Sequence, residues 1–197
     1  DQNKYKKGIP AGVPFLKGMP MKELRKYGHI RRTDDLGRII IPKEIRQFLN
    51  IRENEPLEIS VMERGIYIEK YQPLQTLESL CEQYLTVLFK SCNIACAVCS
   101  NEQIIRSKGI RLSTGQLLSA PLRKGIQNLE TYHYSEESPL RVFDDSKYLL
   151  DSVYPVGSKE QPLGAVILLH YRSTTPEERC CAKLIADILT ELTINQS

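Results

Sequence analysis

The hydrophobic and polar positions of the first third of the chain predict a small unit of short strands. Between residues 28 and 71, brief apolar runs, some of them β-branched, alternate with turn residues, which is typical of short strands. Pro42 suits the first turn of a helix, where its missing N–H costs nothing, and Asn50 would end that helix. Strands are expected at 28–33, 38–41, 57–62 and 66–69, with the helix between the second and the third.

Residues 74–197 show a different pattern, in which helical stripes enclose apolar strands. Apolar residues recur at helical spacing from Leu74 to Phe89. They do so again along a last helix, which starts at Thr175 with its cap, proline and acidic turn in favoured places. Strands are expected at 94–99, 103–106, 153–157 and 164–171, and a further helix is expected from a cap at Ser113 or Thr114 to Leu122. The fold class predicted for the chain is therefore α+β.

Glycines and prolines divide the chain into a tail and two domains. Residues 1–20 hold three glycines and three prolines without apolar periodicity, and we expect a flexible tail or an expression-vector remnant. Tyr71-Gln72-Pro73 marks a boundary, so the domains are expected at 21–71 and 74–197. No run approaches the roughly 18 apolar residues of a membrane helix, and no apolar segment of a secretory signal is present. We therefore expect a cytoplasmic protein that does not engage a membrane.

Charge is distributed unevenly along the chain. Residues 1–46 hold twelve lysines and arginines against five aspartates and glutamates, whereas the complete chain has a formal net charge of only +3. The remainder of the chain is therefore acidic, with a net charge of −4. An anionic partner is accordingly expected at the N-terminal end.

The most specific sequence signal lies in residues 28–46. They read Gly-His-Ile-Arg-Arg-Thr-Asp-Asp-Leu-Gly-Arg-Ile-Ile-Ile-Pro-Lys-Glu-Ile-Arg, with a turn in which Gly37 can adopt positive φ. Further matching residues are Pro-Leu-Glu-Ile at 56–59 and Glu-Lys-Tyr at 69–71. This segment resembles the DNA-binding domain of the SpoVT-AbrB transition-state regulators.

The resemblance implies a fold, a partner and a set of contact residues. In that family two chains exchange their hairpins into one swapped β-barrel, and arginines on one face of the dimer contact double-stranded DNA. Where the family often has a second basic residue, this chain has Gln47, which is therefore not expected to contact DNA. The implied role is a nucleoid-associated regulator of sporulation or stationary-phase genes. The positions that match the DNA contacts are Arg31, Arg32, Arg38 and Arg46.

Physical chemistry favours the same partner independently. Arginine offers paired donors to phosphate or guanine edges. A unit of roughly 45 residues rarely buries enough apolar area alone, which favours an intertwined homodimer. The alternative is that the arginines form a solvated face or are neutralised by Asp34 and Asp35. We expect these two carboxylates to form the turn and orient Arg38 rather than to act as catalytic acids.

The second domain resembles a GAF domain in its order of elements and in the strand around Leu163-Gly164-Ala165-Val166. That resemblance implies a sensor of a small-molecule effector, but no ligand-specific motif is present, so the alternative is a role in assembly alone. The helical stripes at 74–89 and 181–192 are wider than one sheet face can cover. We therefore expect the terminal helices to join two dimers into a homotetramer. The alternative is that both stripes are satisfied within one domain.

The cysteines and histidines form no recognisable catalytic or metal constellation. Cys92, Cys96 and Cys99 invite a metal interpretation, but in an apolar strand Cys96 and Cys99 would face opposite sides. Core packing is therefore favoured over metal binding or redox sensing. Cys180 and Cys181 are neighbours on a helix and point about 100° apart, so no disulfide is expected between them. The scattered histidines are His29, His133 and His170.

No catalytic residue, metal or cofactor is expected, and we predict that the protein is not an enzyme. The leading alternative function is an antitoxin-type module for protein interaction, with autoregulatory DNA binding. Its expected disordered tail conflicts with the folded pattern of residues 74–197. A ligand-responsive enzyme fragment is the least favoured alternative.

Overall fold

The computed structural model describes residues 30–49, 51, 53, 55–62 and 65–194. The chain divides into two compact units, with the boundary between Tyr71 and Gln72, and each unit is described by itself. The expectations for the tail at 1–20 and for the first two residues of the 28–33 strand lie outside the described residues.

A β-hairpin and one short helix are the regular elements described in the first unit. Strand β1 (Leu57–Met62) pairs antiparallel with β2 (Gly65–Lys70), with Leu57 opposite Lys70 and Met62 opposite Gly65. Helix α2 (Lys43–Phe48) begins directly after Pro42, where a proline is well tolerated. The predictions of these strands and of this helix are confirmed.

Of the strands expected at 28–33 and 38–41, the described residues 30–33 and 38–41 do not form strands in the single chain. Residues 30–33 and 38–41 are irregular instead. The turn between them is in place: Gly37, at φ +76°, donates its N–H to the carbonyl of Asp34 at 2.9 Å. Strand structure requires a second backbone to pair with, and the described residues of one chain offer none to this segment.

The first unit exposes many large apolar side chains. The exposed fractions run from 46% at Leu49 to 94% at Ile30. The two buried core clusters contain none of the described residues of this unit, so its described part has no core of its own. The exposed residues are Ile30, Leu36, Ile39, Ile40, Phe48, Leu49, Ile59, Val61 and Ile66.

The second unit is built on one antiparallel sheet in the order β4-β3-β7-β6-β5. The central strand β7 is buried from Gly164 to Leu169, which confirms the prediction of a central apolar strand there. Gly164 packs so closely against β3 that a Cβ added to it would lie 2.0 Å from the carbonyl oxygen of Cys99. The strands are β3 (Cys96–Ser100), β4 (Ile104–Lys108), β5 (Tyr132–His133), β6 (Leu150–Gly157) and β7 (Pro162–Leu169).

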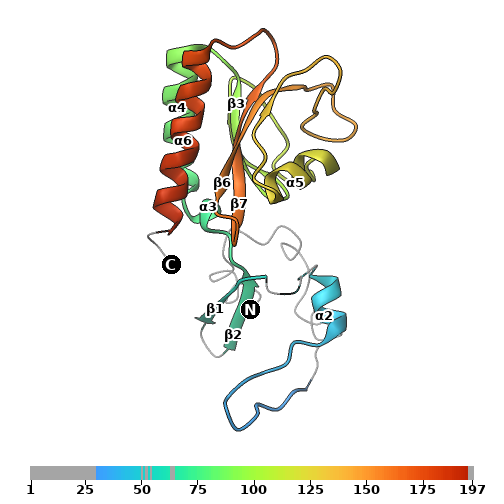
Figure 1. Cartoon of the computed structure of the whole chain (residues 1–197). Helices are drawn as coiled ribbons and strands as arrows, with labels where there is room; N and C mark the ends of the chain where they lie inside the picture. Colours follow the sequence, from blue (N-terminus) through green and yellow to red (C-terminus); the bar gives the residue numbers. More distant parts are fainter. Residues whose placement is uncertain (1–29, 50, 52, 54, 63–64, 195–197) are drawn as a thin grey trace, which may run out of the picture. The chain divides into compact units, whose positions relative to one another are not determined.

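Helices cover both faces of this sheet (Figure 1). The face that carries Val98 and Leu168 packs against α4 (Glu78–Cys92) and α6 (Pro176–Ile194), which lie side by side. The face that carries Ile167 packs against α5 (Ala120–Gln127). The helices α4 and α6 therefore share one face of the sheet.

Local details of the second unit differ from the sequence predictions. The helix expected from 74 to 89 is divided into α3 (Pro73–Thr76) and α4 at Leu77. Neither Ser113 nor Thr114 caps a helix; the Oγ of Ser119 accepts the N–H of Leu122 at 3.4 Å and caps α5 instead. The short strand β5 was not predicted.

The start of α6 follows the predicted capping chemistry. The backbone N–H of Glu178 donates to the hydroxyl of Thr175 at 3.3 Å, and the backbone N–H of Thr175 donates to the carboxylate of Glu178 at 2.9 Å. This reciprocal pair satisfies two N–H groups that a helix otherwise leaves open.

Candidate nucleic-acid interface

Asp34 organises the turn that presents Arg38. Its carboxylate accepts the backbone N–H groups of Leu36 at 3.0 Å and of Arg38 at 2.8 Å, and it pairs with the Nε of Arg38 at 2.7 Å. The backbone and then the side-chain hydrogen bond from Arg38 hold the pKa of Asp34 below its ordinary value. The structure thus supports the interpretation of Asp34 as a turn former that orients Arg38. The ion pair also neutralises part of the charge of Arg38.

The other predicted contact residues lie on either side of this turn. Arg31 and Arg32 are exposed on the irregular segment before it, and Nη1 of Arg31 donates to the carbonyl of Ile30 at 3.3 Å. Arg46 is half-buried on α2, and after the end of this helix the N–H of Ile51 donates to the carbonyl of Arg46 at 2.7 Å. Three of the four arginines thus lie on a single irregular segment around the turn, and the fourth lies on a helix.

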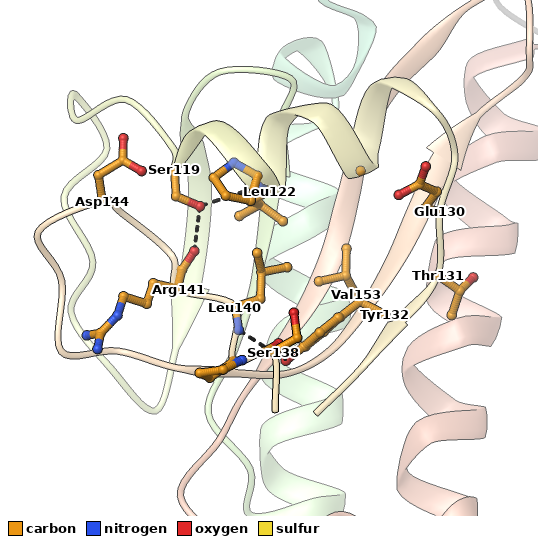
Figure 2. A pocket seen from close by; sticks show the side chains of 13 residues that line it. Ser119, Leu122, Glu130, Thr131, Tyr132, Ser138, Leu140, Arg141, Asp144 and Val153 are labelled. Atoms are coloured by element: carbon orange, nitrogen blue, oxygen red, sulfur yellow. Dashed lines mark hydrogen bonds between the residues drawn. The ribbon is translucent and has the colours of Figure 1, made fainter. Parts of the chain in front are cut away.

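The second unit contains a cavity of about 370 Å³ beside α5 (Figure 2). Leu122, Leu140 and Val153 provide its apolar wall. The hydroxyl of Tyr132 donates to the carbonyl of Ser138 and accepts the N–H of Leu140, each at 3.1 Å, and thereby holds the loop that covers the cavity. The volume is within the range of small-molecule sites. The lining residues all lie between Ser119 and Val153, but no sequence motif predicted them, because the fold of the loops in this stretch brings them together.

Three charged side chains add polarity to the wall of this cavity. Glu130 accepts a hydrogen bond from Asn128 at 2.9 Å, and Asp144 accepts the N–H of Ala120 at 3.2 Å. Arg141 donates to the carbonyl of Ser146 at 2.5 Å. All three are engaged in holding the loops, so they define the shape of the cavity more than they select one ligand.

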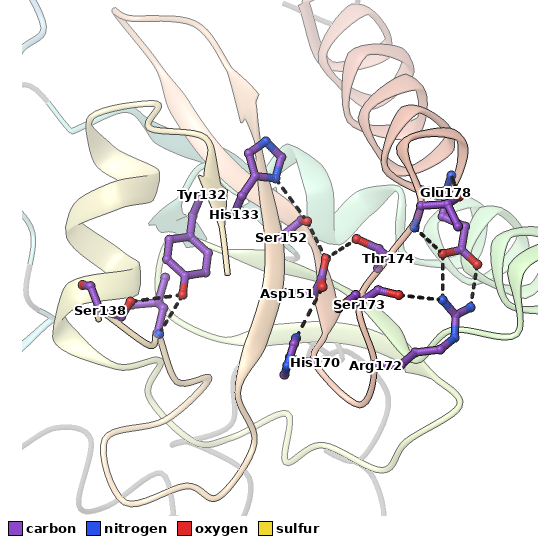
Figure 3. Close-up of polar contacts among 12 residues, drawn as sticks. Tyr132, His133, Ser138, Asp151, Ser152, His170, Arg172, Ser173, Thr174 and Glu178 are labelled. Atoms are coloured by element: carbon purple, nitrogen blue, oxygen red, sulfur yellow. Dashed lines mark hydrogen bonds and ion pairs between the residues drawn. The ribbon is translucent and has the colours of Figure 1, made fainter. Parts of the chain in front are cut away.

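A buried carboxylate ties the sheet to the loop before α6 (Figure 3). Asp151 is 4% exposed and accepts hydrogen bonds from the hydroxyls of Ser152 at 2.7 Å and Thr174 at 2.5 Å. The Nδ1 of His170 lies 3.4 Å from the other carboxylate oxygen, and its ring stacks on Tyr134 at 3.6 Å. A buried charge needs such partners, and this network gives His170 a structural position.

The cysteines of the second unit serve mainly as core residues. All six are free, and Cys96 and Cys99 belong to the core clusters on opposite faces of the sheet, which confirms the prediction from the strand. Burial raises the pKa of each of these two thiols to about 12. Among the residues that the structure describes, no group of three or more His, Cys, Asp or Glu side chains could hold a metal ion.

Long apolar helices are also missing from the described part of the chain. None of its helices combines the length and the apolarity that a membrane crossing requires.

Known proteins resemble this chain along most of its length. Stage V sporulation protein T of Bacillus subtilis (strain 168) is 30% identical over 161 residues, which are 78% of this chain and 89% of that protein. Transition state regulatory protein AbrB of the same organism is 40% identical over 55 residues, or 28% of this chain and 57% of that protein.

Two further comparisons concern single parts of the chain. The family model described as antidote-toxin recognition MazE, bacterial antitoxin, matches residues 30–76. Among solved structures, a domain of a two-component sensor histidine kinase protein from Sinorhizobium meliloti 1021 covers 61% of this chain and 91% of its own, with 16% identity and a TM-score of 0.36. A score this low does not establish a shared fold.

Proposed function

This chain belongs to the SpoVT-AbrB family, and on that premise we propose that it is a transcription regulator that binds double-stranded DNA with its first unit. The two relatives are named as a sporulation protein and a transition state regulatory protein. Sporulation or stationary-phase genes are therefore the proposed targets, and the nucleoid in the cytoplasm is the proposed location. The protein is not an enzyme, as its relatives are regulators.

The exposed apolar surface of the first unit is the main observation that supports our proposal of a swapped dimer. A single chain leaves Ile39 and Ile40 at 51% and 79% exposure on a segment without a pairing strand. A second copy supplies hydrogen-bond partners for the backbone and an apolar surface for the side chains. Its own segment has the same unpaired backbone groups and the same exposed isoleucines. In the proposed homodimer, 30–33 and 38–41 become strands of one exchanged β-barrel.

The dimer also assembles the proposed DNA surface. Two copies double Arg31, Arg32, Arg38 and Arg46 to eight arginines, and exchange of the hairpins brings the segment and α2 of different chains into one body. Clustered guanidinium groups bind phosphates through release of counterions, and base edges then set the sequence preference. The turn held by Asp34 fixes the backbone from which Arg38 extends.

Selection of bound fragments from a random double-stranded DNA library tests this function. The full-length protein is expected to enrich a sequence motif over successive rounds at physiological salt. A variant with alanine at Arg31, Arg32, Arg38 and Arg46 serves as the matched control, and it is expected to enrich none. Equal enrichment by both proteins, or enrichment by neither, contradicts the proposal.

An antitoxin function is the second candidate, and the match to the MazE model over residues 30–76 favours it. An antitoxin needs a segment that wraps a toxin, whereas the chain after residue 76 forms a sheet with helices on both faces. We therefore rank it below the regulator. If the chain is an antitoxin, purification from its native host recovers a stoichiometric small protein whose expression alone stops growth.

We propose that the second unit is a GAF-like domain that senses a small-molecule effector. Its central antiparallel sheet and its cavity of about 370 Å³ support this proposal. Melting experiments with a metabolite library test it, since a ligand that binds the folded unit raises its Tm. The control is Leu140→Trp, which fills the apolar wall and is expected to abolish such shifts.

The outer face of the terminal helices supports the proposal of a homotetramer. Val87 on α4 is 63% exposed and Leu184 on α6 is 58% exposed, although both helices bury their opposite faces in the core. Exposed apolar side chains on neighbouring helices favour contact with the same face of a second copy. In this arrangement the second units join two DNA-binding dimers.

A further inference from the structure

Two cysteines from different helices meet at one end of the second unit. Cys92 is the last residue of α4, and Cys181 lies in the second turn of α6. The two thiols are close enough to share a side-chain hydrogen bond. Eighty-eight residues separate them in the sequence, so only the folded chain brings them together.

Arg172 fastens the two helix ends at this point. Its Nη2 donates to the carbonyl oxygen of Cys92 at 3.1 Å, and its two terminal nitrogens bind the carboxylate of Glu178 at 2.5 and 2.9 Å (Figure 3). Glu178 and Cys181 are three residues apart on α6 and therefore share a face of that helix. Arg172 thus binds the end of α4 and the face of α6 that carries the second thiol.

The two thiols differ in their access to solution. Cys181 is exposed and Cys92 is half-buried. Burial is the main cause that raises the pKa of Cys92, Cys181 and Glu178 raise it further, and Arg172 lowers it. Cys181 is therefore the thiol that meets a dissolved oxidant first, and Cys92 stands behind it as the second thiol.

The other cysteines lack this combination of access and partner. Cys81, Cys96 and Cys99 are fully buried, and burial raises their pKa values to about 11, 12 and 12. Cys180 is exposed, but on a helix its side chain points about 100° away from that of Cys181.

We propose that Cys92 and Cys181 form a reversible redox site, which hydrogen peroxide oxidises to an intrachain disulfide between α4 and α6. The thiolate of Cys181 attacks peroxide, an S–O bond forms, the O–O bond breaks, and the hydroxide leaves as water with a proton. The thiolate of Cys92 then attacks the sulfur of the Cys181 sulfenic acid, the S–S bond forms, the S–O bond breaks, and the hydroxide leaves with a proton as a second water. The two sulfurs lose two electrons in total, and the two peroxide oxygens gain them.

The disulfide is the kind that forms transiently in a reducing compartment. It joins covalently two helices that Arg172 already holds through polar contacts, so little rearrangement of the backbone is required. The two cysteines lie on the face of the sheet that is opposite to α5 and its cavity. The site therefore provides an input that is independent of any ligand in that cavity.

Thiol counting and peptide mapping of the full-length protein test this inference. After brief exposure to hydrogen peroxide, the protein is denatured and alkylated, and its free thiols are counted. The test uses a Cys180→Ser background, because trypsin leaves Cys180 and Cys181 on one peptide after Arg179. In this background the protein is expected to lose two thiols, to show one cross-link between the Cys181 peptide and the peptide of residues 91–106, and to regain both thiols with dithiothreitol.

Two further variants assign the partners. Cys92→Ser is expected to remove the cross-link and to leave a sulfenic acid at Cys181 that dimedone traps. Cys96→Ser, in contrast, is expected to leave the cross-link unchanged, although it lies on the same peptide as Cys92. A cross-link that survives Cys92→Ser, a disulfide between two chains, or unreacted Cys92 and Cys181 in wild-type protein whose Cys180 is oxidised would each overturn the inference.

Discussion

Asp34 and Asp35 are adjacent acids of the same charge, but they have different roles in the turn. Asp34 receives two backbone N–H groups and the guanidinium of Arg38, and it is Asp34 rather than Asp35 that closes the turn. The bonds hold the pKa of Asp34 below its ordinary value. The carboxylate therefore remains charged at neutral pH, and its contribution to the turn disappears only as the pH falls through that lowered pKa.

Replacement of Asp34 by asparagine is expected to weaken specific DNA binding, even though it makes the protein more positive. The turn loses its ion pair and Arg38 loses its fixed orientation, so the ratio of specific to non-specific affinity falls. Asp35→Asn adds the same charge and is the matched control, with the ratio expected to stay near that of the wild type. Fluorescence anisotropy with a selected site and a scrambled site measures both ratios. A lower ratio for Asp35→Asn than for Asp34→Asn would refute the role of Asp34.

Single replacement of Arg31, Arg38 or Arg46 by alanine is expected to weaken DNA binding without unfolding the dimer. The slope of log affinity against log salt should flatten by about one unit for each phosphate-binding arginine that is removed. Lys159→Ala, which removes an exposed charge from the second unit, controls for net charge. Titrations at several salt concentrations give the slopes. Wild-type affinity in all three arginine variants would contradict the assigned surface.

At the scale of helices and strands, the sequence predicted elements well where their signal is local. Pro42 and the Thr175 cap mark the starts of α2 and α6, and alternation marks β1 and the two faces of β3. Where an element depends on a pairing partner from elsewhere, the structure of the single chain differs from the sequence prediction. The segment at 38–41 is β-branched, yet without a paired backbone it is irregular in the single chain.

The cap of α5 shows the same limit. Ser113, Thr114 and Ser119 are all suitable cap residues by type, and only the fold decides which one precedes a helix. Ser119 is the residue that caps α5, and its hydroxyl is held in place because it also donates to the carbonyl of Arg141 at 2.7 Å. The cavity beside α5 could not be predicted either, since its wall depends on such contacts across the unit. The proposed DNA-binding arginines were predicted from a family resemblance. How they come together on one surface depends on the proposed dimer and cannot be seen in a single chain.

Ser119→Ala is expected to lower the free energy of unfolding of the second unit by about 1 kcal/mol, the usual effect of removing a helix cap. Ser119→Ala also removes the donor of the partly buried hydrogen bond to the Arg141 carbonyl, which adds to the effect. Thr114→Ala changes an exposed residue outside any helix and serves as the control. Urea denaturation followed by circular dichroism measures both. Equal stability of the two variants would contradict the cap.

At the scale of the whole molecule, the proposed assembly rests on two different apolar surfaces. The described part of the first unit exposes large apolar side chains on a segment without a pairing strand, whereas the second unit has its own core and exposes apolar side chains on its outer helices. The first surface therefore should produce an obligate dimer, and the second should produce association of dimers. Two pairs of DNA-binding surfaces on one particle raise occupancy through effective concentration.

If the full-length protein is the proposed tetramer, Leu184→Asp is expected to convert it into a dimer that keeps its affinity for a single DNA site. The carboxylate would be desolvated in the contact between outer helices, and it remains hydrated in the free dimer. Lys183→Asp, one residue earlier and also exposed, is the control and should leave the tetramer intact. Multi-angle light scattering gives the mass of each. The same mass for wild type and Leu184→Asp would contradict this interface.

Residues 1–71 alone are expected to be a dimer at micromolar concentration and to lose their structure on dilution. In the proposed dimer, folding and association are one event, because the second chain covers the apolar side chains that the first unit exposes. Sedimentation equilibrium and circular dichroism across a dilution series measure the two together. A folded monomer of residues 1–71 would refute the exchanged barrel.

In the proposed exchanged dimer, the exposed isoleucines of the first unit would also govern how subunits pass between particles. In an exchanged barrel, one chain can leave only after both halves lose their structure, so the barrier to trading partners is the barrier to unfolding. The pairs that form when two chains first meet would then persist over the lifetime of the protein. A cell that begins to make an altered version of the chain would hold old and new pairs side by side, and mixed pairs would arise only from chains synthesised at the same time.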